Sequence, residues 1–500
     1  MKNTTAMRSI ALAALFVTIF AIFYACSDGV APLDGGLPDA TATDSGGTAD
    51  TASDFDATPR PDGGPKPDGG PKPDGGPKPD GGPKPDGATP DGGPPGAIVH
   101  VPSTVGGTTG LAVSIGLPAK ARFSSGKAPV VVAIQGGWDE TGIGVANSYQ
   151  LESAGFVVIQ FNFPGGGAGA TQSGGTPDTR GPDALAAVRD VAKFAMGLLA
   201  DSNGKFLKDL TGTITPSSTN IGFIGSSNGG NASLSTAGLH GTSIPALKWI
   251  VNWESPLGDG AAMGEAGAKG GVVNPTYNDQ TGVFDYAKLK YSSTLNITKA
   301  NPVVSGGFYI DVNSNSTFDT GDYQTFPLFD DLKTKAHYSV GMINAAVQKS
   351  IFPTTPPAHL ASASETATWW SSRDAANNIK QALVNFPNLL FTVEASVEDH
   401  VQIAPDHPHV FAQYDAMRTN GGKFVRLCAD RAYVEEAAGT SVPTAMDNAA
   451  NTAFTRANLR NSVNPETVDS AIALRAAACE LADRSEANNL STNLTAVLSP

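Results

Sequence analysis

The segment Gly225-Ser226-Ser227-Asn228-Gly229 carries residue types suited to nucleophilic catalysis. A serine that attacks a carbonyl group must project from a tight turn between a strand and a helix, and this turn tolerates only small residues two positions away on either side. Ser227 is the central serine, and Gly225 and Gly229 occupy those two positions. An apolar strand candidate precedes the motif and a helix candidate follows it. We therefore predict that Ser227 is a nucleophile.

The elements that must position Ser227 alternate between strand and helix patterns. Continuous apolar runs rich in β-branched residues indicate strands buried on both faces. The expected strands cover residues 111–115, 128–135, 156–161, 220–224, 247–253, 388–394 and 424–427. The expected helices cover about 145–153, 183–199 and 466–487, and a further helix of small residues follows Gly230 and ends at about residue 239. This alternation predicts an α/β fold, a mostly parallel sheet with helices on both faces. An inserted lid or cap is expected at about 258–372, and a C-terminal helical extension at about 434–500.

With these elements, the region from about 97 to 433 resembles the α/β-hydrolase family. That family places an oxyanion loop, often His-Gly-Gly, after its third strand, and Gln135-Gly136-Gly137-Trp138 stands at the matching place here. The resemblance implies that a main-chain N–H near Gly137 or Trp138 joins that of Asn228 in binding the developing oxyanion. Gln135 departs from the usual histidine.

The acid and the base of the implied triad have two possible arrangements. In the family the acid usually follows the seventh strand, which makes Asp399 the natural acid, but no histidine follows His409. Adjacent side chains on an extended segment point to opposite sides, so Asp399 is not expected to orient its neighbour His400 directly. Either Asp399 orients His409 or His407, or His400 is the base and Glu254, at the end of the sixth strand, is the acid. His400 is preferred because it lies nearest the strand end.

A second motif lies in the insertion. Residues 311–322 place side-chain oxygens at loop positions 1, 3, 5, 9 and 12 and a main-chain carbonyl at position 7, a spacing that suits a hard cation. The ligands would be Asp311, Asn313, Asn315, Thr317, Asp319 and Asp322. The motif resembles the calcium loop of EF-hand and dockerin proteins, with Ser316 where glycine is usual. We expect a structural calcium ion that fastens the insertion, and no organic cofactor.

The N-terminus has the pattern of an export signal. Lys2 and Arg8 precede an apolar run over residues 10–23, which is too short for a membrane-spanning helix and suits a signal peptide. The run ends at Ala25-Cys26, which resembles the lipobox of bacterial lipoproteins, so Cys26 is the expected lipid attachment site and membrane anchor. Residues 1–26 thus predict an exported protein, either a lipoprotein of the bacterial outer membrane or cell surface or, after ordinary cleavage near Ala25, a secreted protein.

A low-complexity segment separates this signal from the folded part. Residues 27–96 contain four consecutive copies of Pro-Asp-Gly-Gly-Pro-Lys and almost no residue that a core could bury. Burial therefore cannot compensate the entropy of ordering this segment, and a disordered tether is expected. Residues 97–500 form the expected folded domain.

Charge and cysteine content exclude two classes of protein. With 33 Lys and Arg against 47 Asp and Glu, the formal net charge is −14, which argues against a nucleic-acid partner. Three cysteines are too few for a disulfide-framework protein. After export, Cys428 and Cys479 are expected either to link the last strand to the C-terminal helix by a disulfide or to remain two buried thiols.

These observations predict an extracytoplasmic serine hydrolase. It would cleave an ester or related acyl substrate through an acyl-enzyme on Ser227, and a serine peptidase of the same fold is an alternative. The absence of a histidine after the last strand motivates an alternative of another class. This is a calcium-stabilised binding or adhesion domain that has the hydrolase fold without catalysis.

Overall fold

The structure is a computed structural model. It describes residues 97–258, 268–269, 272–273, 275–278, 283–297, 303–325, 327–329, 335–395, 408–429 and 470–490. Cys26, the predicted signal peptide and the predicted tether lie outside these ranges and stay predictions. Within these ranges, no helix is both long enough and apolar enough to cross a membrane.

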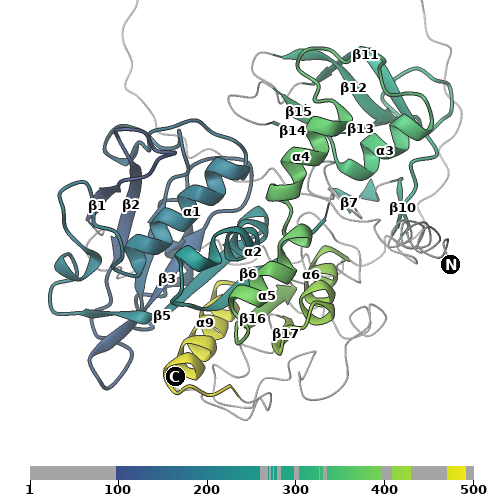
Figure 1. The fold of residues 1–500 in the computed structure, drawn as a ribbon. Helices are drawn as coiled ribbons and strands as arrows, with labels where there is room; N and C mark the ends of the chain where they lie inside the picture. Colours follow the sequence, from purple (N-terminus) through teal and green to yellow (C-terminus); the bar gives the residue numbers. More distant parts are fainter. Residues whose placement is uncertain are drawn as a thin grey trace, which may run out of the picture. The chain divides into compact units, whose positions relative to one another are not determined.

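An eight-stranded sheet forms the framework of the domain (Figure 1). β2 runs antiparallel to both of its neighbours, and the other neighbouring pairs are parallel. Across the sheet, the order is β1 (Ile98–Val101), β2 (Leu111–Gly116), β4 (Val157–Phe161), β3 (Lys127–Ile134), β5 (Thr215–Ser226), β6 (Leu247–Trp253), β16 (Leu390–Ala395) and β17 (Phe424–Ala429). The predicted α/β class with a mostly parallel sheet is confirmed.

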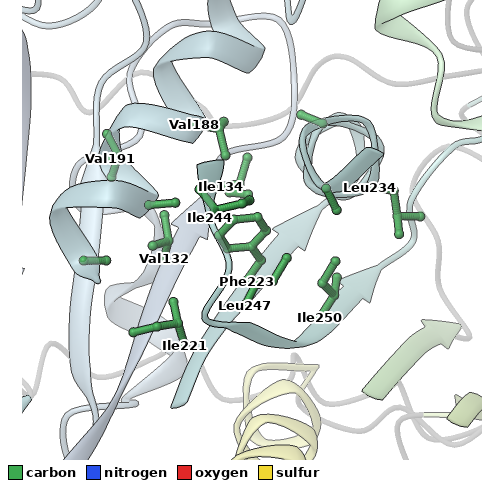
Figure 2. Packing of buried hydrophobic residues seen from close by; sticks show 14 of the residues in the cluster. Val132, Ile134, Val188, Val191, Ile221, Phe223, Leu234, Ile244, Leu247 and Ile250 are labelled. Atoms are coloured by element: carbon green, nitrogen blue, oxygen red, sulfur yellow. The ribbon is translucent and has the colours of Figure 1, made fainter. Parts of the chain in front are cut away.

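The central strands are buried on both faces because successive side chains point to opposite sides of a strand. In β3, Val130 and Val132 enter one apolar cluster and Val131 enters another, and all three are fully buried. Figure 2 shows the first cluster, in which side chains of β3, β5 and β6 face those of two helices, including Val188 and Leu234. This burial explains the continuous apolar runs in the sequence.

Helices cover both faces of the sheet. One face packs against α1 (Pro182–Ala195), α2 (Asn228–His240), α5 (Ile379–Asn385) and α6 (Pro408–Thr419). The other face packs against α9 (Ser470–Glu486) and the 3₁₀ helix η1 (Val145–Tyr149). Further 3₁₀ turns are η2 (Gly169–Thr171), η3 (Leu207–Asp209), η4 (Gly241–Ser243) and η7 (Ala375–Asn377).

Two helix predictions were too long. The helix expected over 145–153 is the short 3₁₀ turn η1, because Gly144 and Gln150, which flank it, both have left-handed backbone conformations. The helix expected over 183–199 ends at Ala195, and Gly197 follows it at φ 70°. A left-handed glycine shortly after the last turn is a common helix stop.

Cys479 lies on α9 and carries a free thiol. The disulfide considered between Cys428 and Cys479 is therefore not formed; the side chain of Cys428 lies outside the described residues. Burial raises the pKa of the Cys479 thiol to about 11. Because the thiolate is the reactive form, this cysteine is expected to react slowly at neutral pH.

The chain between β6 and α5 builds a second apolar core. Its elements are β7 (Ala268–Lys269), β8 (Val272–Val273), β9 (Tyr277–Asn278), β10 (Val283–Phe284), β11 (Leu289–Ile297), β12 (Val304–Ile310), β13 (Tyr323–Gln324), β14 (Leu328–Phe329), β15 (Ala336–His337), α3 (Val340–Gln348) and α4 (Ala363–Arg373). Phe308, Tyr338 and Trp370 are buried in this core. The Trp370 indole N–H donates to the Tyr338 carbonyl at 3.0 Å. We call this segment the cap.

Candidate active site

Ser227 occupies a sharp turn between β5 and α2. Its backbone has φ 48° and ψ −124°, a conformation that a residue with a side chain adopts only under strain. Its amide donates to the Trp253 carbonyl at 2.8 Å, which ties the turn to the end of β6. As a residue, Ser227 is 8% exposed, and its hydroxyl makes no hydrogen bond in the described part of the chain. The turn therefore presents a hydroxyl that no described residue binds.

Close packing explains the glycines around Ser227. A Cβ on Gly225 would lie 2.5 Å from the Cα of Gly230, and one on Gly229 would lie 2.1 Å from the Ile134 carbonyl oxygen. Both distances are shorter than any real Cβ contact. The small residues predicted two positions before and after the serine are thus required by the backbone of the turn itself.

The loop after β3 packs directly against this turn. The Cα of Gly136 faces it so closely that a Cβ there would lie 2.5 Å from the Ser226 carbonyl oxygen and 3.1 Å from Ser227 Cβ. Gly137 has φ 65°, and a Cβ on it would meet nothing within 4 Å. Trp138 packs against the core of the cap. The structure therefore brings the predicted oxyanion loop to the predicted nucleophile.

Asn228 joins the two halves of this site. It is the first residue of α2, and the first amides of a helix have no partner within the helix. Its side chain is fully buried, and its Nδ2 donates to the Gly137 carbonyl at 3.3 Å. The helix amide of Asn228 and the loop amides of Gly137 and Trp138 thus belong to one connected unit, as an oxyanion hole requires.

Buried acidic side chains lie at the neighbouring strand ends. β5 and β6 pair with Ser226 opposite Trp253, so Glu254 follows β6 where Ser227 follows β5. Glu254 is 3% exposed, has φ 45°, and its amide donates to the Glu394 carbonyl at 3.1 Å. The predicted acid Glu254 is therefore placed at the same edge of the sheet as Ser227. Sequence analysis missed Glu394, which is also fully buried although its strand is otherwise largely apolar.

Tyr149 is a further buried group beneath the turn that the sequence did not indicate. Burial raises its pKa to about 12, and the charges of Glu394 and Glu254 act in the same direction, whereas a hydrogen bond with the Ser226 side chain lowers it. Tyr149 is therefore a neutral phenol at physiological pH. Its hydrogen bond with the Ser226 side chain links Tyr149 to the residue before the nucleophile candidate.

The predicted bases and the alternative acid Asp399 lie outside the described side chains. Asp399, His400 and His407 fall in an undescribed stretch, and His409 lies in α6 without a described side chain. Four other histidines occupy different surroundings. His100 bonds the Gln172 carbonyl, His359 bonds the Gly306 carbonyl, His337 stacks on Trp369, and His240 ends α2 roughly 20 Å along the helix from Ser227.

The predicted calcium loop joins β12 to β13. Asp311 is buried and accepts the amides of Asn315 and Ser316, while Asp322 accepts the amides of Val312 and Asp319. The side-chain amides of Asn313 and Asn315 donate to Asp319. Within the described ranges, no three His, Cys, Asp or Glu side chains are grouped as a metal site, so a bound ion would also need Asn and carbonyl oxygens. This oxygen-only donor set has the chemistry that Ca²⁺ prefers.

Two arginines complete the surroundings of the site and were missed by sequence analysis. The side chain of Arg180 is fully buried against the loop after β3, and the buried Arg373, at the end of α4, contacts Asn228. Neither belongs to a local motif. In the sequence, Arg180 stands out only as an arginine among small and polar residues shortly before the start of α1. Arg373 stands out only as an arginine at the end of α4.

Comparisons with known proteins find esterases among the solved structures that align with this chain. No family model matches the chain, and no curated protein matches it. A carboxyl esterase of the mycorrhizal fungus Tuber melanosporum aligns at 13% identity over 67% of this chain and 74% of its own, with a TM-score of 0.33. An esterase of Pyrobaculum calidifontis aligns at 13% identity over 67% and 74%, with a TM-score of 0.32, and one of Pseudomonas putida at 11% over 67% and 71%, with a TM-score of 0.33. Such distant matches establish no activity. The strand order and the turn at Ser227 give the described domain an α/β-hydrolase-like fold.

Proposed function

We propose that the protein is an exported serine hydrolase that cleaves an ester or related acyl substrate. The observation that carries this proposal is the strained turn at Ser227, which places a buried, unbonded hydroxyl against a glycine loop and a helix N-terminus. A site that stabilises a tetrahedral oxyanion needs these three parts together. Strain at a single serine between a strand and a helix also suits a functional position.

In the proposed reaction, Ser227 attacks the substrate carbonyl and forms an acyl-enzyme, which water then hydrolyses. The main-chain amides of Asn228 and of Gly137 or Trp138 bind the oxyanion in both steps. His400 takes the proton of Ser227 and returns it to the leaving group, and Glu254 orients the imidazole. Glu254 suits this role because it is buried beside the nucleophile at the end of the adjacent strand.

Labelling with a fluorophosphonate tests the proposal. The reagent reacts only with an activated serine, so the purified protein should be labelled at Ser227, as identified by peptide mapping. The label should disappear in His400→Ala and persist in His409→Ala, a matched change of the alternative base. Folded protein that takes no label would contradict the proposal and favour a binding domain. If the label is lost only in His409→Ala, His409 and not His400 is the base.

We also propose that the loop from Asp311 to Asp322 binds calcium. Hydrogen bonds from the Gly321 amide and from the side chains of Asn313 and Asn315 lower the pKa of Asp319, so its carboxylate is charged at neutral pH. The loop connects two strands of the three-stranded sheet of the cap, so an ion there would hold this sheet together. Its role would be structural.

Removing calcium should lower the melting temperature by a few degrees, since a ligand that binds only the folded state stabilises it. The change would be followed by calorimetry with chelator and with added Ca²⁺. Asp319→Asn should abolish the calcium-dependent shift. Asp285→Asn, at an exposed carboxylate of the cap outside the loop, should retain it. A melting temperature that does not respond to calcium would contradict the assignment.

A further inference from the structure

Arg180 is held under strain directly beside the candidate oxyanion loop. Thr179 and Arg180 have φ of 52° and 66°, which is uncommon for residues with side chains and strains the backbone at each position. The Arg180 side chain has no exposed surface, and its guanidinium lies 3.8 Å from the centre of the Phe163 ring. A buried charge on a strained backbone indicates that the position of this side chain is important.

The guanidinium of Arg180 binds the loop after β3 along its length. Nη2 donates to the Gly136 carbonyl at 2.8 Å and to the Asp139 carbonyl at 2.7 Å. Nε donates to the Gln135 carbonyl at 3.2 Å, and Nη1 to Glu140 Oε2 at 3.1 Å. The planar fork of an arginine presents several donors in fixed directions, which a lysine cannot reproduce. Arg180 therefore fixes both ends of the loop.

Arg373 reaches the same site from the cap. Its Nη2 donates to Asn228 Oδ1 at 2.9 Å, and Asn228 Nδ2 donates onward to the Gly137 carbonyl. Its Nε donates to the Thr179 carbonyl at 3.2 Å, so it also supports the strained turn that carries Arg180. The Arg373 guanidinium lies 4.9 Å from the centre of the Trp370 ring. The two arginines thus belong to one network.

The carbonyls that receive these bonds share peptide units with the candidate oxyanion donors. A peptide unit is planar and conjugated, so its C=O and N–H belong to one dipole. The Gly136 carbonyl belongs with the Gly137 N–H, and the Gly137 carbonyl belongs with the Trp138 N–H. A positive group that donates to such a carbonyl polarises the unit and strengthens its N–H as a donor. Arg180 acts on the first unit directly, and Arg373 acts on the second through Asn228.

We propose that Arg180 and Arg373 are positioning residues that orient and polarise the two loop amides of the oxyanion hole. This inference rests on the proposed hydrolase function. Because the developing negative charge exists only in the transition state, the arginines should contribute to kcat and to the binding of transition-state analogues. They should contribute little to the binding of the substrate in its ground state.

The first test is Arg180→Lys, which keeps the charge and removes the fork. With an activated ester as substrate, kcat should fall by about 10- to 100-fold with KM nearly unchanged, the range found when groups supporting a site are removed. Affinity for an alkylboronic acid, which forms a tetrahedral adduct with the serine, should fall in parallel. The pH midpoint of kcat/KM should stay the same, because the base itself is not altered.

Arg122→Lys is the matched control. Arg122 is another buried arginine, forms a bidentate ion pair with Asp483, donates to the Ala154 carbonyl and lies beside the Phe156 ring. None of these contacts involves the oxyanion loop. This variant should lower the melting temperature while kcat stays near the wild-type value. If Arg180→Lys loses no more kcat than Arg122→Lys at a comparable melting temperature, the inference is wrong.

The variant Asn228→Ala provides a second, independent test of the inference. It keeps the main-chain amide of residue 228 but breaks the link from Arg373 to the Gly137 carbonyl. Loss of boronate affinity without a matching rise in KM supports the inference even if Arg180→Lys does not fold. Unchanged boronate affinity contradicts the proposed role of Arg373.

The outcomes also separate this inference from the proposed hydrolase function. Wild-type protein that neither hydrolyses the ester nor binds the boronate refutes the hydrolase function, whereas active wild-type protein with unaffected variants refutes only this inference.

Discussion

Replacing Ser227 with alanine should lower the rate of ester hydrolysis by about 10⁴-fold or more, because the other hydroxyl at the turn, that of Ser226, is bonded to Tyr149 and does not replace it. The fold should be retained. Alanine keeps the Cβ that the strained backbone already accommodates, and the lost hydroxyl makes no hydrogen bond in the described structure. Removing a buried polar group that has no partner is expected to leave the free energy of unfolding unchanged or to raise it slightly. Initial rates and thermal melts would measure the two effects.

Ser226→Ala is the natural control for that variant. Ser226 is the adjacent residue, but its side chain hydrogen-bonds Tyr149. Its loss leaves a buried phenol without that partner, so stability should fall by about 1–3 kcal/mol while most of the activity remains. Equal activities of the two variants would show that Ser227 is not the nucleophile.

Gly136→Ala should cause the next largest loss. The added methyl group would lie 2.5 Å from the Ser226 carbonyl oxygen, which belongs to a central strand and cannot easily move. The loop must therefore shift away from the turn, and its amides lose their alignment with the oxyanion. We expect the hydrolysis rate to fall by about 10²- to 10³-fold and the free energy of unfolding to fall by about 1–3 kcal/mol.

The change Gly126→Ala separates steric displacement from backbone strain. Gly126 has φ 79°, and a Cβ there would meet nothing within 4 Å, so alanine costs only about 1–2 kcal/mol of conformational strain. Its rate should match that of the wild type. Wild-type kinetics in Gly136→Ala would mean that the loop after β3 does not bind the oxyanion.

Features that depend on local sequence were predictable. Ser227, Gly225 and Gly229 are defined by spacing within one turn, and the sheet strands show themselves by continuous burial. The loop of Gly136 follows from its position after such a strand. Each of these inferences needs only neighbours in the sequence, and the structure places these residues together.

Features that depend on contacts between distant parts of the sequence could not be predicted. The bond from Arg373 to the Thr179 carbonyl joins residues 194 positions apart, and no local pattern marks either one. Tyr149 and Glu394 likewise become part of the site only when the strands are assembled. The expected helix over 145–153 was wrong for a smaller reason, since the left-handed backbone at Gly144 and Gln150 limits it to one turn.

The contacts of the cap limit how far this segment could be deleted or exchanged in an engineered protein. Trp138 of the loop packs into the core of the cap, and Arg373 at the end of α4 satisfies the buried side-chain oxygen of Asn228. A shortened protein reduced to the sheet and its covering helices would leave that oxygen without its charged donor and the indole without its packing partners. Such minimisation, or the exchange of this segment for that of another protein of similar fold, would disturb the residues beside Ser227 even if every strand remained intact. The cap and the turn at Ser227 therefore form one structural module.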